Sequence, residues 1–442
     1  MKNTIFATAT LPFAAFIACL VACLIAGNSL AQTDPVRSGL EIRVADGPAG
    51  LSSTWLDRRA GDFAAQHLGV DPAAVPDSRH AETAPVQFAW ALEGVSADSQ
   101  AKAPTGARVE SRQYWVDASG ADLAGGVSLP LTARGAVIRV SPLEAGGDVA
   151  IDPASVQLSV NGKRFDSTKS MIQVADGASL QQLGMSVPAR TIAFKLDKTI
   201  PAGKLDLSVA RLPADQKLVV HVFEPESDWV AELALPRDTF VAGETLEFGF
   251  GLGDGQGRAR VDSVQAVLAD PFAEKTWDLE IDKASGTLTR QAPADRFVSG
   301  RDGLFEAYVY LETVQDGLTI RRDLKLPVSI VPPLAKISGP AIAMLDDGLK
   351  LEIGVQTAVP GRFQINGQIF GTAADGTLKP LAMAQAAAVI EGRGGSIGLH
   401  VDKDLLEASG LAAPFEVRNL ELLDQGRMFL LQRQERALVL DD

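Results

Sequence analysis

Residues 304–330, with the sequence LFEAYVYLETVQDGLTIRRDLKLPVSI, carry the clearest indication of the fold. It contains two long extended segments, Leu304 to Thr313 and Leu318 to Ile330. Between them lies Gln315-Asp316-Gly317, and residues of this type favour tight chain reversals. The stretch is therefore typical of a β-hairpin, and the block that it closes is expected to consist of antiparallel strands.

The same strand pattern recurs along most of the chain. Apolar residues alternate with polar or small ones at 86–92 (VQFAWAL), at 156–160 before Asn161-Gly162, at 192–196 and at 349–355. Long amphipathic helical patterns are absent. The sequence predicts a mainly β fold, in which an N-terminal β-rich domain with a short helix precedes two immunoglobulin-like β-sandwich domains.

The one predicted helix lies near the start of the mature chain. Thr54 is placed to cap it, apolar residues then fall on one face as far as Leu68, and Gly69 ends it. A short helix over 54–68 is therefore expected.

Proline-rich junctions predict the domain boundaries. Glu224-Pro225-Glu226-Ser227 follows a strand pattern, and Val331-Pro332-Pro333 follows the second arm of the hairpin. Because proline cannot continue a sheet ladder, such segments are typical of linkers. The expected division is a signal peptide at 1–31, an N-terminal β-rich domain at 32–223, a sandwich at 225–333 and a C-terminal sandwich at 334–442. The pattern leaves open whether 32–223 is one domain or two.

The first 31 residues have the layout of a secretory signal peptide. Lys2 precedes an apolar run from Phe13 to Ala26, and Ser29-Leu30-Ala31 supplies the small residues of a cleavage site. Two alternatives remain open: an uncleaved anchor, and a lipoprotein signal ending at Cys23. We expect an extracytoplasmic protein, periplasmic or secreted, with no membrane span after cleavage.

Composition excludes several classes of chemistry. Cys19 and Cys23 are the only cysteines and both lie in the signal segment, so the mature chain is expected to lack thiol catalysis, disulfides and thiolate metal sites. The net charge of −14 disfavours nucleic-acid binding, because like charges repel phosphate backbones.

Several short phrases resemble one family of exported proteobacterial proteins. They are SRQYW at 111–115, GGVSL at 125–129, GAVIRVSP at 135–142, GRF at 361–363, IFGT at 369–372 and DQGRM at 424–428. They are similar to the DUF4785 domain proteins, over most of the mature chain. The resemblance implies an N-terminal β-rich domain followed by immunoglobulin-like domains, and it supplies no catalytic residues, since the function of that family is unassigned.

Motifs that suggest enzymes have simpler explanations. The G-x-S-x-G match at 394–398 is followed by a strand pattern, whereas the hydrolase elbow needs a helix there. The S-x-x-K match at 99–102 lies in a loop-like stretch. The four histidines, His67, His80, His221 and His400, lack the spacing of a zinc site. The sequence therefore predicts no catalytic residues, no metal site and no cofactor.

Two candidate sites remain. Tyr114 and Trp115 are adjacent, so on a strand their side chains point to opposite faces. One is expected in the core, while the other is a candidate binding residue that stacks on a sugar ring or anchors a partner. A calcium site formed by Glu224, Glu226 and Asp228 at the domain junction is the second, weaker candidate.

These observations favour an exported, non-enzymatic binding or structural protein whose partner is an envelope protein, a secreted protein or a glycan. The alternative is a divergent enzyme, or an enzyme-accessory or inhibitor protein, with its site in the N-terminal domain. A concave pocket with convergent polar groups would favour the enzyme, and an exposed aromatic patch would favour the binding protein.

Overall fold

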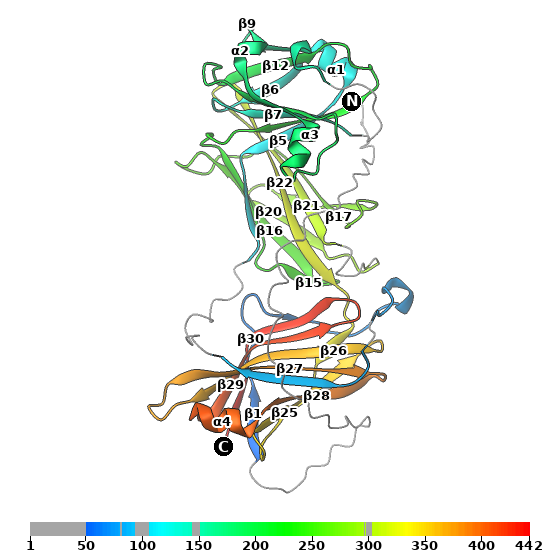
Figure 1. Ribbon diagram of the computed structural model, residues 1–442, viewed down its shortest axis with the longest axis vertical. Coiled ribbons are helices and arrows are strands. Elements are labelled where there is room, and N and C mark those ends of the chain that lie inside the picture. The colour runs from blue at the N-terminus through cyan, green and yellow to red at the C-terminus, as the bar shows by residue number, and fades with distance from the viewer. Residues whose placement is uncertain (1–49, 80–81, 93–105, 144–150, 296, 298–302) are drawn as a thin grey trace.

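The computed structural model describes residues 50–79, 82–92, 106–143, 151–295, 297 and 303–442. These residues form three β domains that follow one another along the long axis of the molecule (Figure 1). The mainly β prediction is confirmed. Within the described residues, no helix has both the length and the apolar character needed to cross a bilayer.

The first domain consists of two packed sheets. One has the order β10-β11-β7-β13-β5 and the other has the order β6-β12-β8-β9. The strands are β5 (Gln113–Ser119), β6 (Val127–Leu131), β7 (Val137–Pro142), β8 (Val156–Val160), β9 (Lys163–Phe165), β10 (Met171–Asp176), β11 (Ile192–Leu196), β12 (Gly203–Val209) and β13 (Lys217–Phe223). Short helices connect them: α1 (Gly120–Gly125), η2 (Pro153–Ser155), α2 (Ser167–Ser170) and α3 (Gly177–Gln182).

The middle domain is also a two-sheet sandwich, with sheet orders β19-β20-β16-β14-β4 and β15-β22-β21-β17-β18. Its strands are β4 (Arg108–Ser111), β14 (Val230–Ala234), β15 (Thr239–Val241), β16 (Thr245–Gly253), β17 (Ser263–Ala269), β18 (Thr276–Asp278), β19 (Glu280–Asp282), β20 (Thr287–Gln291), β21 (Phe305–Gln315) and β22 (Leu318–Val331). The hairpin predicted from 304–330 is confirmed, since β21 and β22 pair along their length with Gln315 opposite Leu318. Its turn residues Asp316 and Gly317 both have positive φ, as a two-residue hairpin turn requires.

The C-terminal domain is a single eleven-stranded sheet, with the path β23-β25-β24-β1-β30-β29-β26-β27-β3 and with β2 and β28 attached to β30 and β25. Its elements are β1 (Gly50–Trp55), β2 (Phe63–Ala64), η1 (Pro72–Ala74), β3 (Val86–Ala91), β23 (Ala335–Ile337), β24 (Ile342–Leu345), β25 (Leu349–Thr357), β26 (Gly361–Thr372), β27 (Leu378–Ile390), β28 (Gly394–Val401), α4 (Lys403–Ser409), β29 (Ala412–Asp424) and β30 (Phe429–Asp441). β28, which pairs with β25 near one end of the path, lies beside β27 and β3 at the other end, so the sheet nearly closes around its own core. The two expected layers of this domain are therefore parts of one rolled sheet.

The segment 50–91 does not belong to the first domain, in which the sequence pattern places it. β1 lies between β24 and β30, with Ser52 opposite Asp441, and β3 pairs with β27. Leu51 and Phe63 pack in the C-terminal core. The chain thus starts in the C-terminal domain, contributes β4 to the middle domain, forms the first domain and then returns.

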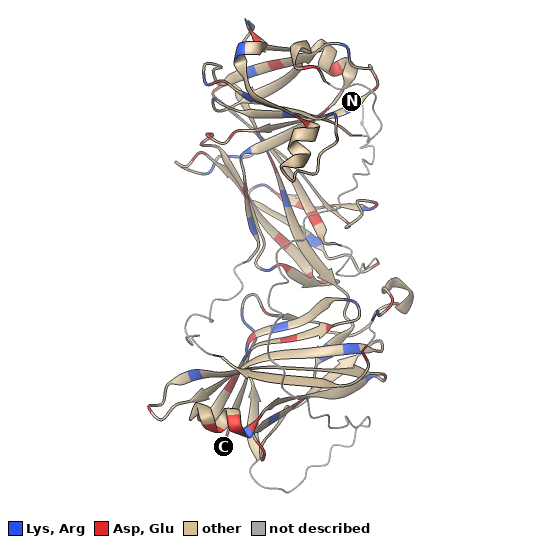
Figure 2. Ribbon diagram, viewed as in Figure 1, with Lys and Arg blue, Asp and Glu red and all other residues tan. Residues whose placement is uncertain are grey.

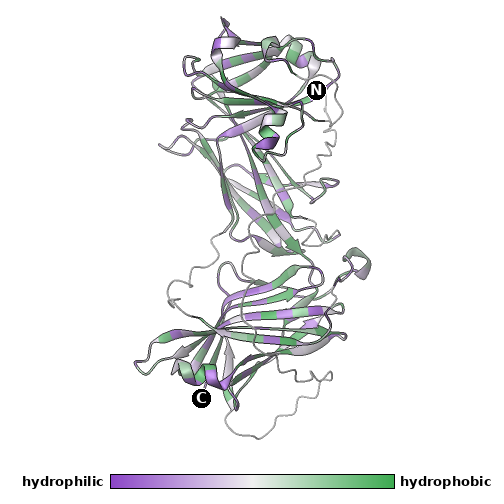
Figure 3. Cartoon of the chain, in the orientation of Figure 1, coloured by the Kyte–Doolittle hydropathy of each residue, from purple (hydrophilic) through white to green (hydrophobic). Residues whose placement is uncertain are grey.

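The predicted helix over 54–68 is wrong. β1 ends at Trp55, and Phe63–Ala64 form the short strand β2 against β30. The helical spacing of apolar residues does not decide the structure here, because β1 and β2 form backbone hydrogen bonds with β30 and bury Leu51 and Phe63 in the C-terminal core. Figure 3 shows the alternation of hydrophobic and hydrophilic residues that marks the strands elsewhere.

Candidate functional site

Tyr114 and Trp115 lie on β5, and neither side chain is open to solvent in the way that a binding aromatic requires. Tyr114 is 0% exposed in the first core, and its hydroxyl donates to the Pro130 carbonyl at 2.9 Å. Trp115 is half-buried and meets Tyr310 of the middle domain edge-on, with ring centroids 5.6 Å apart. Tyr114 is therefore the expected core residue, while Trp115 joins two domains.

The junction of the first and middle domains is organised by a fully buried ion pair. Glu224 and Arg322 have 0% exposed side chains and approach to 3.0 Å. The Glu224 carboxylate accepts from the backbone N–H groups of Thr132 and Ala133, and Arg322 donates to the Ser227 hydroxyl and the Trp229 carbonyl. Almost all donors and acceptors of the two charged groups are hydrogen-bonded, and these bonds offset the cost of burying the charges away from water.

Asp323 completes this junction. Its carboxylate accepts a hydrogen bond from the backbone N–H of Trp115 across the domain boundary, with the nitrogen and oxygen 2.7 Å apart. Burial raises the pKa of Asp323 to about 7, while the Trp115 N–H and the charges of Arg321 and Arg322 oppose that rise. The carboxyl group therefore titrates near neutral pH inside a domain contact.

The calcium candidate is not supported, because two of its three carboxylates are engaged by cations of the protein. Glu224 is committed to Arg322, and Glu226 forms an ion pair with Lys198 at 2.6 Å. In the part of the chain that the structure describes, no three His, Cys, Asp or Glu side chains are grouped as a metal site requires.

The residues of the enzyme-like motifs are dispersed. Ser396 lies within β28, which continues as a strand on both sides of it. His221 contacts Gln113 at 2.9 Å, and burial together with Arg139 lowers its pKa to about 4. His80 and the S-x-x-K match at 99–102 lie outside the described residues.

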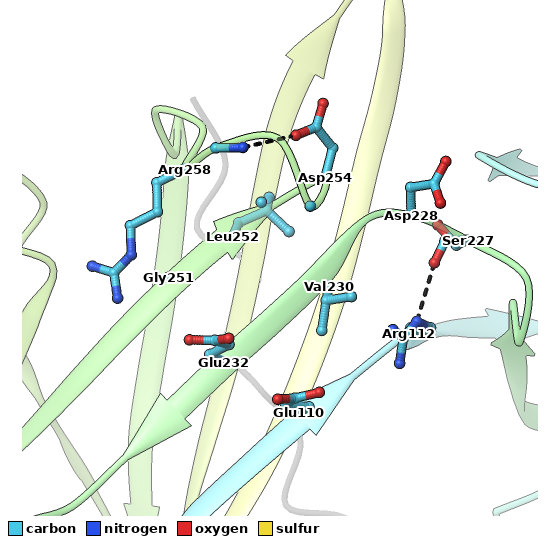
Figure 4. Close-up of a pocket in the computed structure, with 13 residues that line it drawn as sticks. Glu110, Arg112, Ser227, Asp228, Val230, Glu232, Gly251, Leu252, Asp254 and Arg258 are labelled. Atoms are coloured by element: carbon cyan, nitrogen blue, oxygen red, sulfur yellow. Dashed lines mark hydrogen bonds between the residues drawn. The ribbon is translucent and has the colours of Figure 1, made fainter.

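A shallow groove of about 470 Å³ lies on the outer face of the middle domain (Figure 4). Glycines of β16 at 249, 251 and 253 face outward while Phe248 and Phe250 face the core, so the strand leaves a trough. Glu110 and Glu232 face each other across β4 and β14 at its side. Arg108 bridges these carboxylates at 3.4 and 2.6 Å, so this pair of acids is already neutralised in part.

A more distinctive surface lies on the outer face of the C-terminal sheet, at the β3 edge. Phe88 and Trp90 are 53% and 45% exposed, and they are two residues apart, so both point outward. The small residue between them, Ala89, packs toward the core instead. An edge strand that turns a partly buried alanine toward the core and exposes two aromatic rings is the reverse of what core packing favours.

The cross-strand partners of Phe88 and Trp90, and the partners of those residues in turn, continue this surface across β27, β26, β29 and β30. We call the surface formed by the two resulting rows the aromatic–amide face. The first row is Phe88, Gln385, Asn366, Glu421 and Arg433, and the second is Trp90, Met383, Gln368, Arg418 and Arg436. Opposed residues in antiparallel strands share a face, so each row lies on one face of the sheet, although Asn366 within the first row is buried.

Amides and paired charges fill the middle and far side of the aromatic–amide face. Asn419 donates its amide to Gln368 at 2.8 Å, and Arg433 pairs with Glu421 at 2.8 Å. Glu416, beside the second row, accepts from Arg418 at 2.8 Å and from Arg436 at 2.6 Å. Burial alone would raise the pKa of Glu416, but the hydrogen bonds from the two arginines hold it below its ordinary value.

The sequence around Phe88 and Trp90 predicts a strand, but it does not indicate that the side of the strand carrying these two residues is exposed. VQFAWAL at 86–92 alternates correctly, yet alternation alone does not say which set faces the core. The amides and charges come from strands far apart in the chain, and only the sheet register aligns them.

Comparison with known protein families shows the family to which the chain belongs. Residues 77–224 match the model described as the N-terminal domain of a domain of unknown function, DUF4785, and residues 335–441 match its C-terminal domain. The chain belongs to the DUF4785 family. The resemblance drawn from short phrases is confirmed.

Solved structures agree with this assignment at the level of fold. A DUF4785 family protein from Legionella pneumophila superposes with a TM-score of 0.68 at 15% identity, covering 85% of this chain and 98% of that protein. Two further matches are the adhesin domain of Epf from Streptococcus pyogenes (TM-score 0.15, 12% identity, 57% and 94% coverage) and the chicken CNTN1 FN1–FN3 domains (TM-score 0.18, 8% identity, 71% and 97% coverage). The last two scores are too low to support any argument. No curated protein sequence matches this DUF4785 chain.

Proposed function

We propose that this DUF4785 protein is an exported, non-enzymatic binding protein that binds a component of the cell envelope through the aromatic–amide face. The signal-peptide layout of residues 1–31 supports export. The observation that carries the binding role is the exposure of Phe88 and Trp90 side by side on one face of an edge strand. Exposed aromatic pairs of this kind are costly in water and are enriched where proteins hold ligands or partners.

The surroundings of the pair favour recognition over chemistry. The face combines aromatic rings with amides and arginine–glutamate pairs, which supply contact area and hydrogen bonds. The nearest titratable groups that we find on it are engaged in ion pairs with one another. This arrangement suits holding a ligand in one orientation.

The test is co-sedimentation of the purified mature chain with separated envelope fractions. We expect one insoluble fraction to retain the wild-type chain, and the F88A/W90A variant to lose at least about tenfold in retention, since each ring contributes apolar contact. The matched control is L183A/I281A, which removes two exposed apolar side chains from the other two domains. Retention that is equal in F88A/W90A and wild type, or absent from every fraction, would overturn the proposal.

A further inference from the structure

The chemistry of the aromatic–amide face identifies the class of ligand that fits it. We propose that the face binds an uncharged polysaccharide chain, whose sugar rings stack on Phe88 and Trp90 and whose hydroxyls bond to the amides beyond. This inference rests on the proposed binding function and names the ligand of the same face.

The two aromatic rings supply the apolar part of such a site. Phe88 and Trp90 are separated by one residue, which places them about 7 Å apart along β3. Ring faces exposed at an edge offer flat apolar contact, which matches the apolar faces of a sugar ring. Only these two large rings are exposed on the strand, so the apolar area is narrow and suits a thin chain more than a protein interface, whose core is broader.

The amides supply the polar part. Each Asn or Gln side chain both donates and accepts hydrogen bonds, and so does each sugar hydroxyl. Gln385 lies directly beside Phe88, is partly exposed, and makes no side-chain hydrogen bond to any residue within the described ranges. Its amide is therefore available to a ligand that stacks on the neighbouring ring.

Charge on the face argues for an uncharged ligand. Arg418 and Arg436 both bond to Glu416, and Arg433 bonds to Glu421, so each of the three arginines has a carboxylate partner. Figure 2 shows the same mixture of signs over the molecule, without one sign gathered on the C-terminal sheet. A polyanion would need cations free to bond to it, whereas each arginine of this face is already bonded to a carboxylate.

The rows also define the path of the ligand. From β3 to β30 each row crosses four inter-strand steps of about 4.8 Å, so the face is about 19 Å wide. A chain that starts on the aromatic edge meets Gln385 next, then the partly exposed Gln368, and reaches the arginine–glutamate pairs last, while Asn366 is buried between the strands' other side chains. The ligand thus runs across the strands, with stacking at one end and hydrogen bonds along the rest.

The test is affinity electrophoresis of the full mature chain in gels that contain dextran, a β-glucan, a galactomannan or, as the charged probe, polygalacturonate. We expect retardation by at least one uncharged probe that persists at about 0.5 M salt, because no ionic contact is involved. F88A/W90A should weaken binding by at least about tenfold and Q385A by a smaller factor, while L183A/I281A leaves it unchanged. Matching circular dichroism and melting curves establish that each variant is folded.

A second measurement separates this inference from the proposed binding function. The envelope fraction that retains the protein is treated either with protease or with periodate, which breaks the C–C bond between adjacent carbons that each carry a hydroxyl. Loss of retention after periodate, with none after protease, supports the polysaccharide. Binding that depends on Phe88 and Trp90 but is lost after protease, or retardation by polygalacturonate alone that disappears with salt, would overturn the ligand class and leave the binding function standing.

Discussion

At the scale of single residues, the pair Glu224–Arg322 makes the strongest prediction about stability. Replacing Arg322 by Met leaves the Glu224 carboxylate buried without its cation, although the Thr132 and Ala133 N–H groups remain. We expect the free energy of unfolding to fall by about 3–5 kcal/mol, measured by urea denaturation.

The matched double variant separates a lost ion pair from lost packing. In E224Q/R322M neither charge is left buried alone, so a large part of the R322M loss should return. A double variant that is as unstable as R322M would show that the arginine acts mainly through its hydrogen bonds to Ser227 and Trp229.

Arg237 makes a similar prediction at the other junction. It bonds to Glu244 at 2.5 Å and to the Asp62 carbonyl at 3.0 Å, and its guanidinium lies over the rings of Phe240 and Phe63. Because Asp62 and Phe63 belong to the C-terminal domain, R237A should uncouple it from the middle domain and split the calorimetric unfolding peak. R237K, which keeps the charge but loses the planar stacking, should give an intermediate profile. An unchanged single peak in R237A would contradict this role.

At the scale of elements, the strands of 50–91 are predicted to stabilise a domain that is far away in sequence. A truncated chain that begins at residue 106 lacks β1, which pairs with β24 and β30, and β3, which covers the edge of β27. Hydrogen exchange should therefore lose protection across 335–441 while 113–223 stays protected, because unpaired strand edges open readily. The control is the chain that begins at Gly50, which keeps all described strands. Equal protection of 335–441 in the two chains would contradict the pairing.

At the scale of the whole molecule, the contact of Asp323 with Trp115 predicts a pH dependence of stability. The pKa of Asp323 is raised to about 7 in the folded protein, above about 3.9 for an unfolded aspartate. The folded state therefore binds this proton more tightly, so protonation stabilises it. Stability from this group is fully present below about pH 4 and is lost as the pH rises toward about 7.

This prediction is checked by urea denaturation between those two pH values. D323N keeps an acceptor for the Trp115 N–H but cannot ionise, so its unfolding free energy should fall less steeply than that of wild type over this range. The wild-type slope from this group is at most about 1.4 kcal/mol per pH unit. Burial also raises the pKa of Asp117, so D323N should reduce the slope without abolishing it. Parallel curves for the two proteins would contradict the assignment.

The strands and tight turns could be predicted from local sequence alone. The hairpin of β21 and β22 follows from two extended segments around Asp316-Gly317, because positive φ at both turn residues is a local property of the chain. The family also follows from local phrases. Export rests on the first 31 residues and stays a prediction.

The partners of each strand, and the side of it that is exposed, became known from the three-dimensional structure. The segment 50–91 joins the C-terminal sheet because backbone edges from distant parts of the chain satisfy one another, and no local pattern encodes that choice. Alternation in VQFAWAL is equally compatible with the aromatics inside or outside, and only the position of β3 beside β27 places Ala89 against the core and the two rings outside. The aromatic–amide face likewise exists only through register, since its rows join residues that are hundreds of positions apart.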